Sequence, residues 1–487
     1  MKKWVLGLVL ILTLSSFPAF SANPPKPGSV CSKKGITKTY KGKKFTCTKS
    51  GKKLVWSKGV AVKNAAPIIS PTPTPTPTPS PTISTSQSTP WKLTNLEFFD
   101  PIQNCRVATD LDGSEHLGFP RPITSIPTLG NQKSIMLFID FPDAMGDQAV
   151  LNEFIKVQIP TMKQGLEELS YGQLTSTVDV VNKYFRLQKS IEYYNLLFQY
   201  NVINYATQGL PADAKLQEFL KDVVEVTDPQ VDFSKYDFVS IITSNGSRLG
   251  LDGSVGFRFI LDGKAFNFAH MSFSSTKEYF GNPDKATSLL HDVGHMMGIP
   301  HGWGGFPYGN ANNPIINVPI WSLMATGGGS PHPDLLAWER FLLGWIDEKN
   351  VRCISEWKTS DFTIEIGRIN QVDTKSKMVV IRLNKYEAII IESPDDTVFD
   401  YVKTNSIRWK YDGSPGVIIY SLNTNILSNY GAFRLLYPSN TSERMDGRPW
   451  GLTKVNESIE IASRNIKIRV LNSDIKGNVI EVSKIES

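Results

Sequence analysis

The stretch HDVGHMMGIPH, residues 291–301, restricts the fold more than any other part of the sequence. His291 and His295 are four residues apart, so on a helix they project one above the other from the same face. Gly298 stands one turn later, where a residue in the left-handed conformation can end a helix at little cost. The chain can then reverse and bring His301 back to the other two imidazoles. The sequence therefore predicts a helix, a sharp turn and three converging histidines.

The residues around the motif support the helix. Pro283 suits a first helical turn, and either Asn282 or Asp284 can cap it. Apolar residues then recur at helical spacing and predict one buried face. They are Ala286, Leu289, Leu290, Val293 and Met297.

Three imidazoles in this arrangement match the ligands of a tetrahedral zinc site whose fourth position stays open. We expect His291, His295 and His301 to bind zinc and Asp292 to supply a carboxylate that exchanges protons. The helical H-E-x-x-H signature of zinc peptidases has glutamate at that position, and aspartate is one methylene shorter. The remaining histidines lack this spacing and are interpreted as structural or surface residues: His116, His270 and His332.

Two later stretches extend the pattern. WSLMATGGG places Met324 in a glycine-rich turn, 23 residues after His301. Metzincin-type enzymes carry a methionine turn beneath the zinc in the same order along the chain. HPDLLAWERFLLGWI, residues 332–346, then predicts an amphipathic helix that ends at Gly344.

The N-terminal residues have the features of an exported protein. Residues 1–22 combine two lysines, an apolar run too short to span a bilayer and small residues at the end, which predicts a secretory signal peptide. No later apolar stretch is long enough to hold the chain in a membrane, so we expect a secreted protein, extracellular or associated with the cell wall. Four cysteines permit two disulfides in that compartment. Cys31 and Cys47 lie in one short segment and are expected to pair, which leaves Cys105 for Cys353.

Charge sets the first segment of the mature chain apart. Residues 1–64 hold 14 lysines and no acidic residue, which leaves 38 basic against 46 acidic residues in the rest of the chain. We interpret residues 23–64 as a small β-containing module held by its disulfide, because it is too short for a large core. Such a module can bind anionic cell-wall polymers, and the alternative is a solvated appendage without a partner. Nucleic acid is not expected as a partner outside the cell.

Three further segments follow from residue 65 onward. Repeated Thr-Pro dipeptides in residues 65–90 predict an extended, semi-rigid linker. Strand and helix signals alternate in residues 91–350, which predicts a mixed α/β (α+β) domain around the histidine motif. Residues 351–487 consist of short β-branched runs between Gly, Asp, Asn and Pro residues, so we expect a β-rich region arranged as a sandwich.

Residues 119–423 resemble the immune-inhibitor-A-type family of secreted bacterial zinc metallopeptidases. The resemblance rests on FIDFPD, SYGQL, VDFSKYD, HDVGHMMGIPH, SLMA, AWERFLLGWI and GVIIY, in this order. It implies a zincin-like domain with endopeptidase activity on extracellular proteins or peptides, the three motif histidines as zinc ligands, Asp292 as the base and Met324 in the methionine turn. Calcium is often structural in such proteins, but no complete calcium loop occurs here, and LGLDGSVG is interpreted as a turn.

Because Asp292 replaces the glutamate of the signature, three interpretations of the function stay open. The protein is an active or attenuated zinc endopeptidase, a zinc-binding pseudopeptidase with a binding or structural role in the cell envelope, or a surface adhesin without zinc. Residues 91–118 also have the position of an inhibitory segment, but Cys105 lacks a recognisable switch context, and a disulfide is the simpler interpretation.

Overall fold

The computed structural model describes residues 26–61, 91–194, 214–244, 254–301, 322–326, 334–394, 416–426, 431–436 and 451–485, with short gaps inside several of these ranges. The predicted signal peptide and the predicted linker lie outside the described residues. The chain divides into two compact units, one within Met1–Gln87 and one within Ser88–Ser487. No helix in the described part of the chain is long and apolar enough to cross a membrane.

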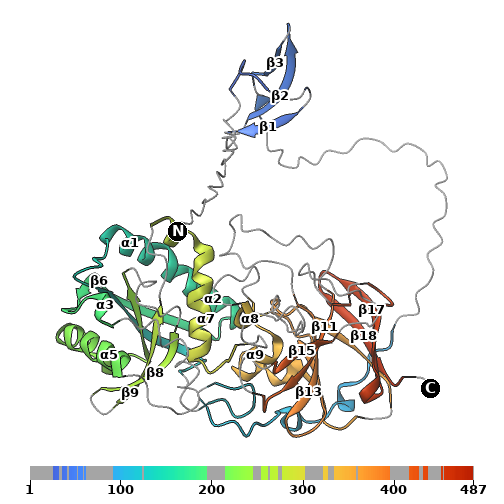
Figure 1. Cartoon of the computed structure of the whole chain (residues 1–487). Helices are drawn as coiled ribbons and strands as arrows, with labels where there is room; N and C mark the ends of the chain where they lie inside the picture. Colours follow the sequence, from blue (N-terminus) through green and yellow to red (C-terminus); the bar gives the residue numbers. More distant parts are fainter. Residues whose placement is uncertain are drawn as a thin grey trace, which may run out of the picture. The chain divides into compact units, whose positions relative to one another are not determined.

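The N-terminal unit is a small antiparallel sheet (Figure 1). Its strands are β1 (Thr37–Tyr40), β2 (Lys43–Ser50), β3 (Lys53–Trp56) and β4 (Val60–Ala61). β2 pairs with each of the other three strands. The predicted disulfide between Cys31 and Cys47 is present and packs with Phe45 and Trp56 in one buried cluster. So small a core supplies little burial, and the disulfide compensates by restricting the unfolded chain.

The first part of the large unit is built on a five-stranded sheet of order β6-β5-β7-β9-β8. Its strands are β5 (Gly130–Asp140), β6 (Leu174–Arg186), β7 (Phe238–Thr243), β8 (Ser254–Leu261) and β9 (Lys264–Met271). Only the edge strand β8 runs antiparallel to its neighbour. The turn predicted at LGLDGSVG lies partly outside the described residues, and its last residues begin β8.

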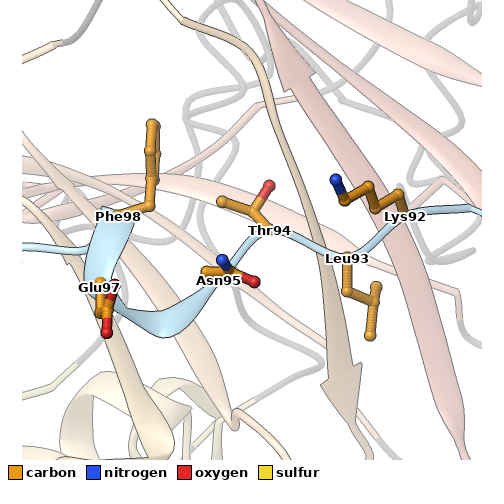
Figure 2. Close-up of a pocket in the computed structure, with 6 residues that line it drawn as sticks. All are labelled: Lys92, Leu93, Thr94, Asn95, Glu97 and Phe98. Carbon is orange, nitrogen blue, oxygen red and sulfur yellow. The ribbon is translucent and has the colours of Figure 1, made fainter.

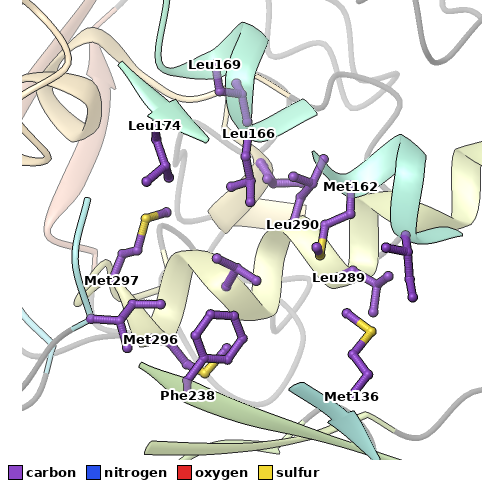
Figure 3. Close-up of a cluster of buried hydrophobic side chains, with 14 of the residues drawn as sticks. Met136, Met162, Leu166, Leu169, Leu174, Phe238, Leu289, Leu290, Met296 and Met297 are labelled. Carbon is purple, nitrogen blue, oxygen red and sulfur yellow. The ribbon is translucent and has the colours of Figure 1, made fainter. Parts of the chain in front are cut away.

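Helices cover both faces of this sheet (Figure 1). They are α1 (Gln148–Glu153), the π-helical turn η3 (Phe154–Gln158), α2 (Ile159–Leu169), α3 (Ile191–Tyr194), α5 (Ala214–Thr227) and α7 (Ala286–Met296). Successive β5 side chains point to opposite faces. Met136 and Phe138 join a cluster with α1, α2 and α7, part of which Figure 3 shows. Ile135 and Leu137 join a second cluster with α3 and α5. The predicted mixture of helices and sheet is confirmed.

The helix that carries the histidine motif is α7. The short helix α6 (Lys277–Phe280) and the 3-10 turn η8 (Pro283–Lys285) precede it. Asn282 directly precedes η8, which starts at Pro283 and continues into α7, but the N-cap position of α7 itself is occupied by Lys285 and not by Asn282 or Asp284. The predicted end is confirmed, since Gly298 has a φ of 93°. Its N–H donates to His295 O, and the chain then reverses.

The helix predicted over residues 332–346 is shorter than expected. The structure has α9 at Ala337–Leu342, and the chain turns at Gly344 with a φ of 82°. The helix begins late because Leu336 is extended and its N–H donates to the Glu339 carboxylate, which fixes the first turn at this point. Residues 332 and 333 lie outside the described residues.

The C-terminal part contains two sheets. One has the order β10-β12-β13-β14-β15 and the other β11-β18-β17-β16. The strands of the first are β10 (Val351–Ile354), β12 (Met378–Arg382), β13 (Glu387–Glu392), β14 (Ile418–Asn423) and β15 (Phe433–Leu436). Those of the second are β11 (Phe362–Gly367), β16 (Ser458–Ile461), β17 (Ile466–Asp474) and β18 (Gly477–Ser483). Both sheets contribute to one hydrophobic cluster, as expected for two packed β layers.

The two parts of the large unit share a core. Trp338 of α9 and Leu117 pack in one cluster with Val380 and Ile390 of the C-terminal sheet. The segment before β5 contains the 3-10 turns η1 (Leu96–Phe98) and η2 (Ile102–Cys105). It is joined to β10 by the second predicted disulfide, Cys105 to Cys353, which is present. The first residues of this segment are therefore attached to the β-rich part.

Candidate metal centre

The three predicted histidines meet at the end of α7. The Nε2 atom of His295 lies 3.0 Å from that of His291 and 3.0 Å from that of His301, and the last two are 3.1 Å apart. His291 and His295 are buried and His301 is half-buried. Among the described residues these three form a group able to hold a metal ion. His116 is buried outside this group, and the side chain of His270 and all of His332 lie outside the described residues.

Backbone carbonyls fix the tautomers of two of these rings. His291 Nδ1 lies 2.9 Å from Leu323 O, and His295 Nδ1 lies 2.9 Å from Ile299 O. Because a carbonyl oxygen only accepts, each Nδ1 must carry the proton, which leaves the lone pair on Nε2. Lone pairs that face one another across about 3 Å repel unless a cation lies between them. The spacing is compatible with metal–nitrogen distances of about 2.0–2.1 Å, so the donor set fits a metal ion.

Burial and one carboxylate set the charges of these rings. Burial, with a smaller effect of the neighbouring rings, lowers the pKa of His291 to about 3 and that of His301 well below its ordinary value. Burial also opposes protonation of His295, but the Glu115 carboxylate, together with Asp292 and the Ile299 carbonyl, outweighs it and raises the His295 pKa. Glu115 Oε2 lies 3.3 Å from His295 Nδ1. An acidic group behind a ligand histidine orients the ring and makes it a better donor. Sequence reasoning did not find Glu115, because it lies 180 positions before His295 and in no motif.

Asp292 stands between His291 and His295 on α7 and is buried. Burial raises the pKa of its carboxyl to about 7, and His295 acts in the opposite direction. The buried Asp292 carboxyl group is close enough to His295 for their charges to interact, and its role as a base stays a prediction. A carboxyl group is able to accept and release a proton during a reaction at this site.

The predicted methionine packs against the ligand helix. Met324 lies in the short helix α8 (Leu323–Thr326) and is fully buried. A Cβ added at Gly294 would come within 2.5 Å of Met324 Sδ. Gly294, between the two ligands of α7, therefore allows the methionine to approach the helix directly. Leu323 O, one residue earlier, binds His291, so α8 contacts the histidine group through both its backbone and its side chain.

Two buried glutamates were not predicted from the sequence: Glu339, which accepts a hydrogen bond from Ser322, and Glu392, which lies on β13. Burial raises the pKa of Glu339 to about 8 and that of Glu392 to about 7, from an ordinary value of 4.5. Glu392 accepts hydrogen bonds from Tyr420 Oη at 2.7 Å and Ala337 N at 2.8 Å. Arg340, which pairs with Asp334, adds a favourable charge near Glu392 that only partly offsets burial.

We expect the Glu392→Gln substitution to change how stability depends on pH. The unfolded carboxyl ionises near pH 4.5, and the folded one near pH 7, so the folded protein holds more protons between these values. The contribution of this carboxyl group to the free energy of unfolding, on the order of 3 kcal/mol, is fully present below about pH 4.5 and is lost as pH rises through about 7. Urea unfolding from pH 5 to 8 should therefore show a flatter decline for the variant. Glu460→Gln, an exposed control, should follow the native curve, and a parallel decline of all three proteins would contradict the prediction.

A surface pocket lies in a different segment. Figure 2 shows its lining, which comes from one short run of residues: Lys92, Leu93, Thr94, Asn95, Glu97 and Phe98. Thr94 N donates to Thr363 O, so this run is attached to strand β11. None of the residues of the histidine group lines the pocket. It therefore adds nothing to the metal centre.

No protein-family model matches the chain, and no curated protein matches it either. Its function is therefore inferred from its own residues.

Proposed function

We propose that this protein is a secreted zinc endopeptidase that hydrolyses peptide bonds of extracellular proteins, with a zincin-like domain similar to that of immune-inhibitor-A-type metallopeptidases. The observation that carries the proposal is the convergence of three Nε2 atoms within 3.1 Å of one another, two of them with tautomers set by backbone carbonyls. Imidazole donors suit zinc, and three protein ligands that leave one position open are typical of catalytic sites.

Each residue of the site has a distinct role in this proposal. His291, His295 and His301 would hold the metal, and zinc, when bound, supplies the Lewis acidity that polarises the scissile carbonyl. The Asp292 carboxylate accepts a proton from the attacking water and passes it to the nitrogen of the leaving amine. Aspartate is one methylene shorter than the glutamate of the signature, which places its carboxylate about 1 Å farther from the attacking water. A displacement of this size can slow turnover on the order of 100-fold. We therefore expect a slow enzyme.

The sheet beside α7 offers a surface for an extended peptide. α7 contacts β8 and β9, and β8 ends the order of the sheet. An edge strand can pair with an added strand through backbone hydrogen bonds, which suits substrates of varied sequence. We propose that polypeptide substrates pair with β8 through their backbone, so that the bound chain runs alongside the histidine group.

The test measures cleavage of a panel of unfolded proteins by the zinc-loaded full chain and by Asp292 variants. A zinc-binding pseudopeptidase is the second candidate, because Asp292 departs from the signature. The two candidates differ in one result, since a pseudopeptidase binds zinc but cleaves none of the panel.

We also propose that the N-terminal unit attaches the protein to anionic cell-wall polymers. Residues 26–61 contain eleven lysines and no acidic residue. Several of these lysines are exposed: Lys26, Lys34, Lys49, Lys53 and Lys58. With no carboxylate in this segment to neutralise them, their charges favour a polyanion as partner.

Retention on isolated cell walls should fall steeply as salt rises. Exposed charges are screened over about 8 Å at physiological ionic strength and about 3 Å at 1 M, so an electrostatic attachment weakens with added salt. The measurement is co-sedimentation of the full chain with cell walls over a salt series, beside a chain that starts at Trp91. Equal retention of both chains would show that the N-terminal unit has no such role.

A further inference from the structure

A buried hydroxyl joins the methionine turn to a carboxylate. Ser322 Oγ lies 2.9 Å from each carboxylate oxygen of Glu339 and donates its proton there. The same oxygen accepts the Met324 N–H at 3.0 Å. Ser322 and Glu339 are both fully buried. These hydrogen bonds are therefore shielded from water, and losing one leaves a buried polar group without its partner.

The residue between Ser322 and Met324 holds a metal ligand. Leu323 O accepts the Nδ1 proton of His291 at 2.9 Å. Its N–H donates to Asp334 O at 2.6 Å. A shift of Ser322 or Met324 would move this carbonyl, and the His291 ring would lose its orientation.

The carboxylate is itself anchored from the C-terminal sheet. Glu339 Oε2 accepts the Leu336 N–H at 2.7 Å, at the start of α9. The next residue, Ala337, donates its N–H to Glu392 of β13, and Tyr420 of β14 donates to the same carboxylate oxygen. A continuous set of hydrogen bonds and covalent links thus runs from this sheet through α9 and Ser322 to His291.

We propose that Ser322 and Glu339 are positioning residues for His291, through which the C-terminal β-rich part sets the metal affinity of the site. The inference rests on the proposed zinc site and adds to it a structural reason for the β-rich part. The Ser322 hydroxyl is the group to test, because among the described residues it hydrogen-bonds both to the Glu339 carboxyl group and to the Met324 backbone. Its removal should turn the Leu323 carbonyl and misalign the His291 lone pair.

The test compares two buried hydroxyl groups, one that contacts α9 itself and one that contacts the residue directly after α9. Ser322→Ala removes the positioning group. Thr128→Val is the matched control, because Thr128 is buried and its hydroxyl donates to Leu343 O at 2.8 Å, beyond the other end of α9. Zinc affinity is measured on the full chain by competition with a chromophoric chelator, and the visible spectrum of the cobalt(II)-loaded protein reports ligand geometry. Thermal unfolding of the metal-free proteins measures how far each substitution lowers the unfolding temperature.

Ser322→Ala should weaken zinc binding about 10-fold or more and alter the cobalt spectrum, as is typical when a group behind a metal ligand is lost. Thr128→Val should lower the unfolding temperature to a similar degree but keep native affinity and spectrum. Native zinc affinity in both variants would overturn the inference and leave the proposed function intact, whereas a native protein that binds no zinc would overturn both. If Ser322→Ala does not fold, Glu339→Leu replaces it, since leucine has a similar volume but offers no oxygen to accept the Ser322 hydrogen bond, and it must show the same loss.

Discussion

Replacing His295 by alanine should remove stoichiometric zinc from the secreted protein. The native chain is expected to hold about one zinc ion, and His295 supplies one of three Nε2 atoms that lie 3.0 to 3.1 Å from one another. Without it two imidazoles remain, and an incomplete set of ligands loses most of the binding free energy. Elemental analysis after dialysis against metal-free buffer should therefore find about one zinc per native chain and almost none in the variant.

His116→Ala is the matched control for this substitution. His116 is a buried histidine outside the histidine group, so its removal should leave the zinc content unchanged. Full zinc in His295→Ala would refute the assignment of the ligands. A native chain without zinc would instead favour the interpretation of a surface adhesin.

The histidine group could be predicted from sequence because its geometry is local. The spacing of His291 and His295 places both rings on one helix face whatever surrounds the helix. Gly298 adopts a positive φ as predicted, and the turn needs only the next few residues to return His301. The two disulfides were predictable for a similar reason, since few pairings of four cysteines exist. Local rules therefore sufficed to bring the three histidines together.

The groups that support the ligands could not be predicted in this way. Glu115 contacts His295 from a segment that precedes the whole sheet in the sequence. Glu339 lies in α9 and contacts Ser322, the residue directly before α8. Such contacts depend on how separate segments pack against one another. Nothing in the residues around a single glutamate in the sequence indicates which other segment it will contact. The buried Glu392 is a clear example, because its strand EAIIIES reads as an ordinary β-strand.

The strands of the C-terminal part were predictable, and their pairing was not. β-branched runs indicated β11, β12, β13, β14 and β17. β11 pairs with β18, more than a hundred residues later, and β10 pairs in parallel with β12. Alternation of apolar residues predicts a buried face but does not specify the neighbouring strand. The same limit explains why the connection from the β-rich part to the metal centre emerges only from the fold.

Replacing Asp292 by asparagine should lower peptidase activity by about 10²- to 10⁴-fold while zinc remains bound. An amide has nearly the same volume as the carboxyl group but cannot take a proton, and general acid-base catalysis typically contributes a factor of this size. Zinc content should be unchanged because Asp292 is not one of the three grouped ligands. The measurement is the initial rate of cleavage of an unfolded protein, with zinc content determined on the same samples.

Replacing Asp292 by glutamate should raise activity above the native level. The longer side chain restores the reach of the glutamate in the signature, and a gain of about 1 Å can be worth on the order of 100-fold. A fall with both glutamate and asparagine would instead mean that the backbone of α7 is adapted to aspartate and that the native enzyme is fully competent. Activity in the glutamate variant alone would identify a pseudopeptidase whose other parts remain assembled. No cleavage by either protein at full zinc occupancy, over a broad panel of substrates, would refute the peptidase proposal and favour a binding role.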